Sequence, residues 1–240
     1  MKTKIIFILC MISSIIAFGQ NQKTTEEITC TPPLFTGIKS TNPMQVEAKF
    51  PTIENYLIKN VIYPEVAKEQ LRQGTEIVRF IVTTQGEIAN IEIINSVSRE
   101  IDYEVISTLL TTNGMWKPGH NNEKPMSMEK EVSILFKIDE MGCDIDKLGI
   151  KYYSHGAQML FTKNNPKKAL KYFDKGITLL PKETNLLALR GLTRFELGDK
   201  EGALKDWTRI NALGGLEGTD YIESYMGMKG YAEMKQVLGR

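Results

Sequence analysis

The chain has 240 residues, with 30 basic and 29 acidic side chains, and 42% of its residues are hydrophobic. This composition is typical of a soluble globular protein of one or two domains. Residues 20–150 carry 13 basic and 19 acidic side chains, whereas residues 151–240 carry 15 and 10. Neither balance is extreme enough to indicate nucleic-acid binding, and the alternating charges instead indicate solvated helix faces.

The N-terminus has the pattern of an export signal. Lys2 and Lys4 precede an apolar run from Ile5 to Phe18, and the small residues Ala17 and Gly19 occupy the positions that a signal peptidase reads. A run of about 14 residues is shorter than the roughly 20 that span a bilayer. We therefore predict that residues 1–19 are a cleaved signal peptide.

Two cysteines remain after this cleavage, Cys30 and Cys143. They form an even pair in a compartment where thiols are oxidised, so they could form a disulfide. Two separate thiols are the alternative, because sequence alone does not show whether the residues are close.

Residues 20–48 are predicted to be a linker, and two short helices open the domain predicted for residues 49–140. The first helix follows Pro51, and Pro64 begins the second, which we expect to end at Gly74. The residues of these helices that are expected to face the core are Ile53, Tyr56, Leu57, Val66, Ala67 and Leu71.

A hairpin is predicted next. Residues 75–83 are rich in β-branched and aromatic side chains, Thr84-Gln85-Gly86 has turn chemistry, and residues 88–94 return as the partner strand. Ser98 is then in position to cap a helix that ends at Gly114. The apolar face of that helix consists of Ile101, Val105, Ile106, Leu109 and Leu110.

The domain closes with a strand over residues 131–138, in which apolar and polar side chains alternate. Such alternation is typical of a half-buried antiparallel strand. The inward residues are Val132, Ile134, Phe136 and Ile138. Leu135 is an apolar residue among the outward polar ones, so we expect this strand to lie at the sheet edge, where its unpaired backbone groups could bind an extended peptide.

The order and local motifs of residues 49–138 resemble the TonB C-terminal domain family. The motifs are Tyr63-Pro64-x-x-Ala67, Gly74, the hairpin with Gly86, Ile101-Asp102-x-x-Val105, Trp116-x-Pro118-Gly119 and Leu135-Phe136. The resemblance implies a three-stranded sheet with helices on one face, which in that family receives the Ton box of an outer-membrane transporter as an added strand.

The chain also departs from a full TonB protein. It has neither an uncleaved N-terminal anchor nor a long spacer rich in Pro and Lys, so we do not expect it to transmit force across the periplasm alone. In addition, Asn60-Val61-Ile62 stands where the family favours Gln-Pro-Gln before Tyr-Pro.

Residues 150–240 repeat with a period of 34 residues. The equivalent pairs are Ala157 and Gly191, Phe161 and Phe195, Ala169 and Ala203, Leu170 and Leu204, and Phe173 and Trp207. This pattern resembles the tetratricopeptide repeat over residues 150–217, and residues 219–238 are expected to form a capping helix. The predicted fold class is therefore α+β: a three-stranded antiparallel sheet with helices, followed by an all-α helical-repeat domain.

Several residues admit a structural as well as a functional interpretation. Tyr63 and Pro64 could begin a helix and cover the core, or they could contact a peptide. Trp116 is expected to fill the core. His120 and His155 have no partner at metal-ligand spacing, and the chain has no motif of a known enzyme class, so we predict no cofactor, no metal and no catalysis.

Two functions remain open. The first is a periplasmic protein-binding module whose peptide-binding residues are Tyr63, Pro64, Ser133, Ile134 and Leu135, with a helical-repeat adaptor. Its partner would be a protein or peptide, and the resemblance implies an outer-membrane transporter. The chain would be at most peripheral to the membrane. The second is a repeat-based scaffold or assembly factor of the cell envelope with no transport role.

Overall fold

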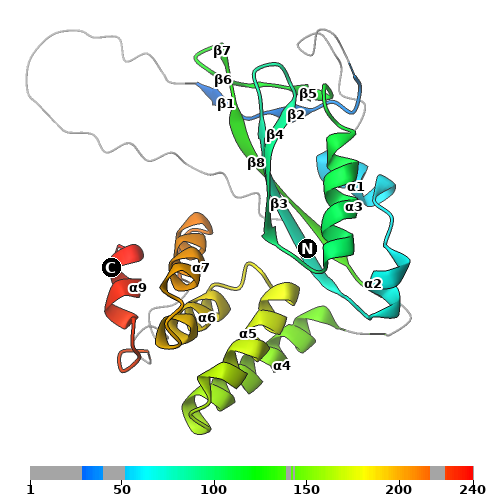
Figure 1. Cartoon of the computed structure of the whole chain (residues 1–240). Coiled ribbons are helices and arrows are strands. Elements are labelled where there is room, and N and C mark those ends of the chain that lie inside the picture. Colours follow the sequence, from blue (N-terminus) through cyan, green and yellow to red (C-terminus); the bar gives the residue numbers. More distant parts are fainter. Residues whose placement is uncertain (1–28, 40–51, 139–141, 143, 217–224, 240) are drawn as a thin grey trace, which may run out of the picture.

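The structure is a computed structural model that describes residues 29–39, 52–138, 142, 144–216 and 225–239. The predicted signal peptide and Cys143 lie outside these ranges. Figure 1 shows a sheet with helices along one side in the N-terminal half and a group of helices in the C-terminal half. None of the helices in the described ranges combines the length and the apolar character that crossing a bilayer requires.

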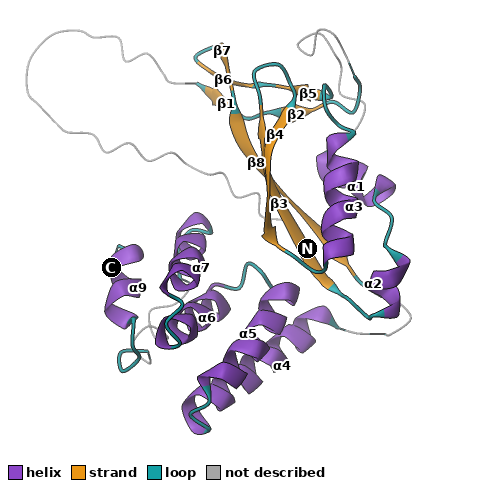
Figure 2. Cartoon of the chain, viewed as in Figure 1, coloured by secondary structure: helices purple, strands orange, loops and turns teal. Residues whose placement is uncertain are grey.

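The central sheet has three antiparallel strands in the order β4-β3-β8 (Figure 2). Their bounds are β3 (Gly74–Val82), β4 (Ile88–Asn95) and β8 (Met128–Phe136). β3 and β8 pair without interruption over nine residues, whereas the pairing of β3 with β4 contains two register shifts. Each shift adds one residue to β4, which is how a β-bulge bends an edge strand.

Three helices cover one face of this sheet: α1 (Ile53–Asn60), α2 (Glu65–Glu69) and α3 (Arg99–Leu110). Thr52 and Ser98 cap α1 and α3 by accepting hydrogen bonds from backbone N–H groups of the first turn. The fully buried residues between helices and sheet include Leu57, Ala67, Phe80, Ile101, Val105, Leu109 and Trp116. These elements confirm the predicted α+β fold class.

The second helix is shorter than predicted. α2 ends at Glu69, and Leu71 has a left-handed backbone with φ of 55°. Val66 and Leu71, which were expected to face the core, are about half exposed, and of the three predicted residues only Ala67 is buried. Gly74 does not end the helix, because it is already the first residue of β3.

Part of the expected linker belongs to the sheet domain. β1 (Cys30–Thr31) pairs with β6 (Gly119–Asn121), which also pairs with β7 (Lys124–Met126). β2 (Leu34–Phe35) pairs with β5 (Trp116–Lys117), and the Phe35 ring is buried with its centroid 5.0 Å from that of Trp116. The two-residue strands are thus held by partners more than 80 residues away in the chain.

The C-terminal half consists of helical hairpins. α4 (Ile145–Ala157) continues into a π-helical turn, η3 (Gln158–Thr162), and packs against α5 (Pro166–Leu179). α6 (Thr184–Glu196) packs against α7 (Lys200–Ala212), and α9 (Tyr231–Val237) contacts both.

Glycine residues allow the paired helices to approach closely. Gly191 lies against the Trp207 ring, as the 34-residue period predicts for that pair. In the first hairpin, however, the residue against Phe173 is Gly156 and not its neighbour Ala157. A side chain at either glycine would collide with the aromatic ring, so both hairpins depend on a missing Cβ.

The two halves meet at the sheet face opposite α1 and α3. A Cβ at Gly74 would collide with the backbone carbonyl of Thr178, and the Thr75 hydroxyl donates a hydrogen bond to the Leu179 carbonyl over 3.2 Å. Arg209 of α7 binds the carboxylate of Glu131 in β8 through both terminal nitrogens, at 2.6 and 2.7 Å. The helical half is therefore docked on the sheet by polar contacts at two places.

Candidate peptide-binding edge of the sheet

β8 is an edge strand, as predicted, since among the described strands it pairs with β3 alone. The direction of its backbone groups follows from β3. Thr83 donates its N–H to the Glu87 carbonyl across the hairpin, and the Thr75 carbonyl accepts a hydrogen bond from the Asn95 side chain. Odd-numbered residues of β3 thus direct their backbone groups toward β4, and even-numbered residues direct theirs toward β8.

Because each residue of β3 pairs with one residue of β8, the backbone groups of β8 alternate in the same way. Glu76 faces Ile134, so Ile134 is hydrogen-bonded to β3, and Ser133 and Leu135 direct their N–H and C=O groups to the free edge. The Ile138 N–H, which donates to the Gln73 side chain over 2.8 Å, has the same parity as Ile134. Two of the three predicted β8 residues therefore offer backbone groups to an added strand, and Ile134 does not.

The side chains of β8 likewise alternate between buried and more exposed positions. Val132, Ile134 and Phe136 are buried against the helices, whereas Leu135 is 55% exposed and Ser133 is partly exposed. An added strand would therefore find one exposed apolar side chain beside two free pairs of backbone groups. Main-chain hydrogen bonds would supply most of its contacts, as in other cases of β-augmentation.

Tyr63 contacts β8 from the side of the core, and Pro64 follows it in the chain. The Tyr63 hydroxyl donates to the Arg72 carbonyl, and its ring packs edge-on against Phe136 with centroids 5.3 Å apart. Burial raises the pKa of Tyr63. Pro64 precedes α2 and lines a shallow hollow with Tyr103 of α3. The structure thus brings Tyr63 to the core side of β8, where it covers the core, and places Pro64 at the start of α2.

Charged groups surround β8 on the face that meets the helical half. Arg79 lies 3.5 Å from a Glu131 oxygen and 3.9 Å from Glu129, and Arg209 binds Glu131 as described above. Although partial burial alone would raise the pKa of Glu131, the hydrogen bonds and charge of Arg209 lower it. Glu131 is therefore ionised and fixed two residues from Ser133.

One buried carboxyl group was not anticipated from the sequence. The Glu76 side chain is 0% exposed, and one of its oxygens accepts the Val97 N–H over 2.9 Å. Burial, with the nearby Asp102 charge, raises the pKa of Glu76 to about 9, so it is protonated at neutral pH. The signal was available in the sequence, since Glu76 has the parity of the core residues Val78 and Phe80 in β3.

The described ranges contain the side chains of Cys30 and of both histidines. No group of three or more His, Cys, Asp or Glu residues there is placed to hold a metal ion. Cys30 is exposed in β1 and has no disulfide partner among the described residues, and because Cys143 lies outside them the disulfide stays a prediction. His155 packs against the ring of Tyr172, with centroids 5.5 Å apart.

Comparisons with known proteins bear on the sheet domain. No curated protein matches the chain. The NMR solution structure of the C-terminal domain of Helicobacter pylori TonB aligns with a TM-score of 0.29 and 15% identity, over 35% of this chain and 88% of that one. Residues 59–138, a third of the chain, match the family described as Gram-negative bacterial TonB protein C-terminal. The match includes β3, β4, α3 and β8 and ends before the helical half, so this part of the chain is similar to the protein-interaction domain of TonB proteins.

Proposed function

We propose that the chain is an exported periplasmic protein-binding module that receives an extended peptide at the free edge of β8. The peptide resembles the Ton box of an outer-membrane transport protein, and the helical half is a repeat-type adaptor that binds or positions a second protein. The chain has no catalytic role in this function.

The observation that carries the proposal is the free edge itself. Ser133 and Leu135 direct outward backbone groups that have no partner among the described residues, in a strand that lies within the TonB-like match. β8 is nine residues long and regular, so it lacks the bulges that usually protect an edge strand. A regular and accessible edge in an interaction domain is a suitable surface for strand addition.

The test is a titration of the chain with synthetic Ton-box peptides, followed by the NMR amide shifts. Ser133→Pro removes an outward N–H and should weaken binding about tenfold or more while the fold persists, because proline is tolerated on an edge strand. Ser133→Ala keeps the N–H and is the matched control, so it should bind as the wild type does. Ile134→Pro removes an N–H that is bonded to β3 and should instead destabilise the sheet.

Three outcomes would contradict strand addition at β8. Shifts that cluster at Tyr63 and Pro64 would place the peptide on the core side of the domain. Equal binding by Ser133→Pro and Ser133→Ala would show that the outward N–H is not used. The absence of any peptide binding would favour the alternative function, a scaffold or assembly factor of the envelope in which the sheet domain serves only for packing.

A further inference from the structure

A cavity of about 840 Å³ lies between the two halves of the molecule, away from the free edge of β8. Its sheet wall is formed by the outer face of β3 and β4, and its helical wall by α5, α6 and α7. This volume lies within the range of about 300–1,000 Å³ in which ligand pockets fall, and such pockets are frequent at domain interfaces.

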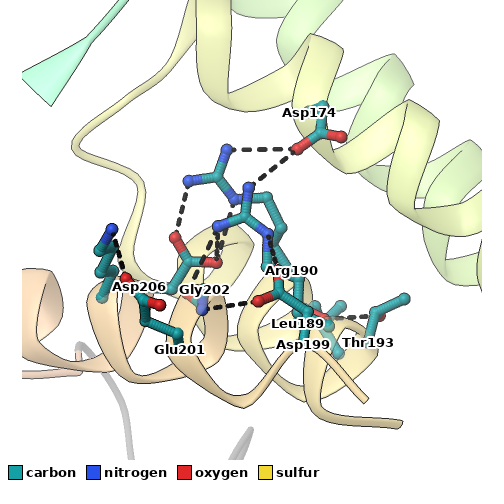
Figure 3. A network of polar contacts seen from close by, with 10 residues as sticks. Asp174, Leu189, Arg190, Thr193, Asp199, Glu201, Gly202 and Asp206 are labelled. Atoms are coloured by element: carbon teal, nitrogen blue, oxygen red, sulfur yellow. Dashed lines mark hydrogen bonds and ion pairs between the residues drawn. The ribbon is translucent and has the colours of Figure 1, made fainter. Parts of the chain in front are cut away.

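The helical wall is a closed network of charges (Figure 3). Asp206, which is 3% exposed, accepts hydrogen bonds from Arg190 at 2.7 Å and from Arg194 at 2.9 Å. Both guanidinium groups also approach Asp174, at 3.4 and 3.5 Å. These contacts fix the two arginines to one another, so the wall is rigid and its donors are largely occupied.

Arg79 in the sheet wall and Arg209 in α7 differ from these two arginines, because each carries an N–H donor without a hydrogen-bond acceptor among the described residues. The Arg79 guanidinium has carboxylate oxygens at 3.5 to 3.9 Å but forms no hydrogen bond with any described residue. Arg209 uses both terminal nitrogens for Glu131, and its Nε is buried without a partner in the described ranges. A guanidinium group has five N–H donors, and buried donors of this kind are normally satisfied.

The interior of the cavity is positive, although its lining as a whole is almost balanced. The four arginine side chains are at most 27% exposed, and the only acidic side chain of comparable burial in the lining is Asp206. The remaining acidic groups, Glu92, Asp174 and Glu201, are 47 to 81% exposed and are therefore screened by solvent. Glu131 lies between Arg79 and Arg209 and compensates one of these two charges, while Glu92 and Glu129 approach Arg79 only to 3.9 Å and from exposed positions.

We propose that this cavity is a second binding site, for a ligand that carries a carboxylate beside an apolar chain. Arg79, whose guanidinium group forms no hydrogen bond with a described residue, donates to the carboxylate, and the charge of Arg209 lies beside it across Glu131. Ile177, Leu187 and Leu204 line the cavity and contact the apolar chain. The carboxylate belongs to a free carboxylic acid or to an acidic residue of a polypeptide. The site lies over β3 and β4 and is separate from the proposed peptide-binding edge of β8.

The experiment measures binding of two probes to the whole chain by calorimetry and by the NMR signals of the arginine Nε–H groups. Hexanoate represents a free acid, and acetyl-Leu-Glu-Leu-Glu-amide represents a polypeptide; hexanamide and the corresponding Gln peptide are the neutral controls.

Arg79→Gln should weaken binding of the acidic probes about tenfold, since it removes a charged hydrogen-bonding partner. Arg79→Lys keeps the charge but not the fork of donors and should have an intermediate effect. Arg99→Gln makes the same charge change at an exposed position of α3 and should not affect binding.

A second pair of variants keeps the test independent of Arg79. Leu204 is half exposed in the lining, so Leu204→Glu places a negative charge at the cavity with little effect on the fold, and Leu204→Gln is its neutral control. Leu204→Glu should weaken binding of the acidic probe more than Leu204→Gln does. Ser133→Pro should leave it unchanged, which separates this site from the β8 edge.

Binding of both acidic probes assigns the site to small carboxylic acids, and binding of the peptide alone assigns it to polypeptides. The proposal is overturned if neither acidic probe binds, if the neutral probes bind as well, or if both Arg79→Gln and Leu204→Glu bind as the wild type does.

Discussion

Glu76 places a carboxyl group in the core of the sheet domain, directly opposite the edge-strand residue Ile134. Its pKa of about 9 lies far above the ordinary value of 4.5, because burial penalises the charged form. The folded state therefore keeps a proton that the unfolded chain releases above pH 4.5. The contribution of Glu76 to stability is fully present below pH 4.5 and is lost as the pH rises toward 9.

Glu76→Gln should remove this pH dependence. The amide retains an acceptor for the Val97 N–H and carries no charge at any pH, so the variant should gain stability relative to the wild type as the pH rises from 5 to 8. The gain is at most about 1.4 kcal/mol per pH unit. Urea unfolding at several pH values measures it, with the exposed Glu87→Gln as a control for the lost charge. Parallel stability profiles for wild type and Glu76→Gln would contradict the assignment.

At the scale of elements, each helical hairpin is built around one aromatic residue against one glycine. Trp207 is 2% exposed, lies against Gly191 and stacks near Phe195 with ring centroids 5.9 Å apart. The corresponding contact in the first hairpin joins Phe173 to Gly156. Because a glycine faces each ring, the ring fills the space between the two helices of its hairpin and the helices can pack closely.

Trp207→Ala should lower the free energy of unfolding of the helical half by about 3–5 kcal/mol, because it leaves a cavity between α6 and α7. Circular dichroism and amide exchange would report the loss in these helices, and Phe161→Ala, at an aromatic residue that is 53% exposed, is the control. A loss of protection in β3 and α3 equal to that in α6 would instead show that the two halves unfold as a single unit.

The elements that the sequence predicts well are those whose signals are local. β3 and β4 follow from β-branched and aromatic residues on either side of a turn, β8 from alternation, and α3 from Ser98 and its apolar spacing. The bounds differ, since β8 covers Met128–Phe136 and not residues 131–138, and α3 ends at Leu110, before Gly114. β1 and β2 have two residues each and no periodicity, so only their pairing with distant strands defines them. α2 was predicted too long because Leu71 adopts a left-handed backbone that apolar spacing does not reveal.

The candidate site was predicted only in part for the same reason. The pattern of residues 131–138 indicates an edge strand, but the direction of its N–H groups depends on the register with β3, which a single strand does not encode. Tyr63 could cover the core or contact a peptide, and its contacts with Phe136 and the Arg72 carbonyl agree with the covering role, while the peptide contact stays a prediction. The cavity between the halves depends on how they dock, which no local pattern specifies.

At the scale of the whole molecule, polar contacts at two places join the described parts of the two halves. The bidentate pair of Arg209 and Glu131 is the strongest of them, with both side chains less than a third exposed. The contacts of Gly74 and Thr75 with the end of α5 lie at the other end of the interface.

A double-mutant cycle of Arg209→Gln and Glu131→Gln should give a coupling energy of about 1.5–3 kcal/mol, as expected for hydrogen bonds between charged groups. The matched cycle of Lys147→Gln and Asp144→Asn removes an exposed ion pair and should give less than about 1 kcal/mol. Chemical denaturation measures both. Equal values for the two cycles would mean that the interdomain pair contributes no more than a surface contact.

The compartment is also a property of the whole chain. We expect the mature protein to begin close to Gln20 and to be recovered in a soluble periplasmic extract, because residues 1–19 are predicted to be a cleaved signal. Intact-mass measurement of the exported protein decides this. Recovery of the full-length chain in the membrane fraction would refute the cleavage and would change the proposed location.

The two edges of the central sheet are not equivalent, and this asymmetry limits how the protein can associate. β4 carries two extra residues relative to β3, which twist its backbone away from a flat pairing geometry, whereas β8 pairs with β3 without a register shift. Copies of a sheet with two regular edges can pair at both sides and grow into a fibre, but copies with one regular edge can pair only through that edge. Two copies joined through β8 would leave only their bulged β4 edges, so edge-to-edge association of this protein would stop at a pair.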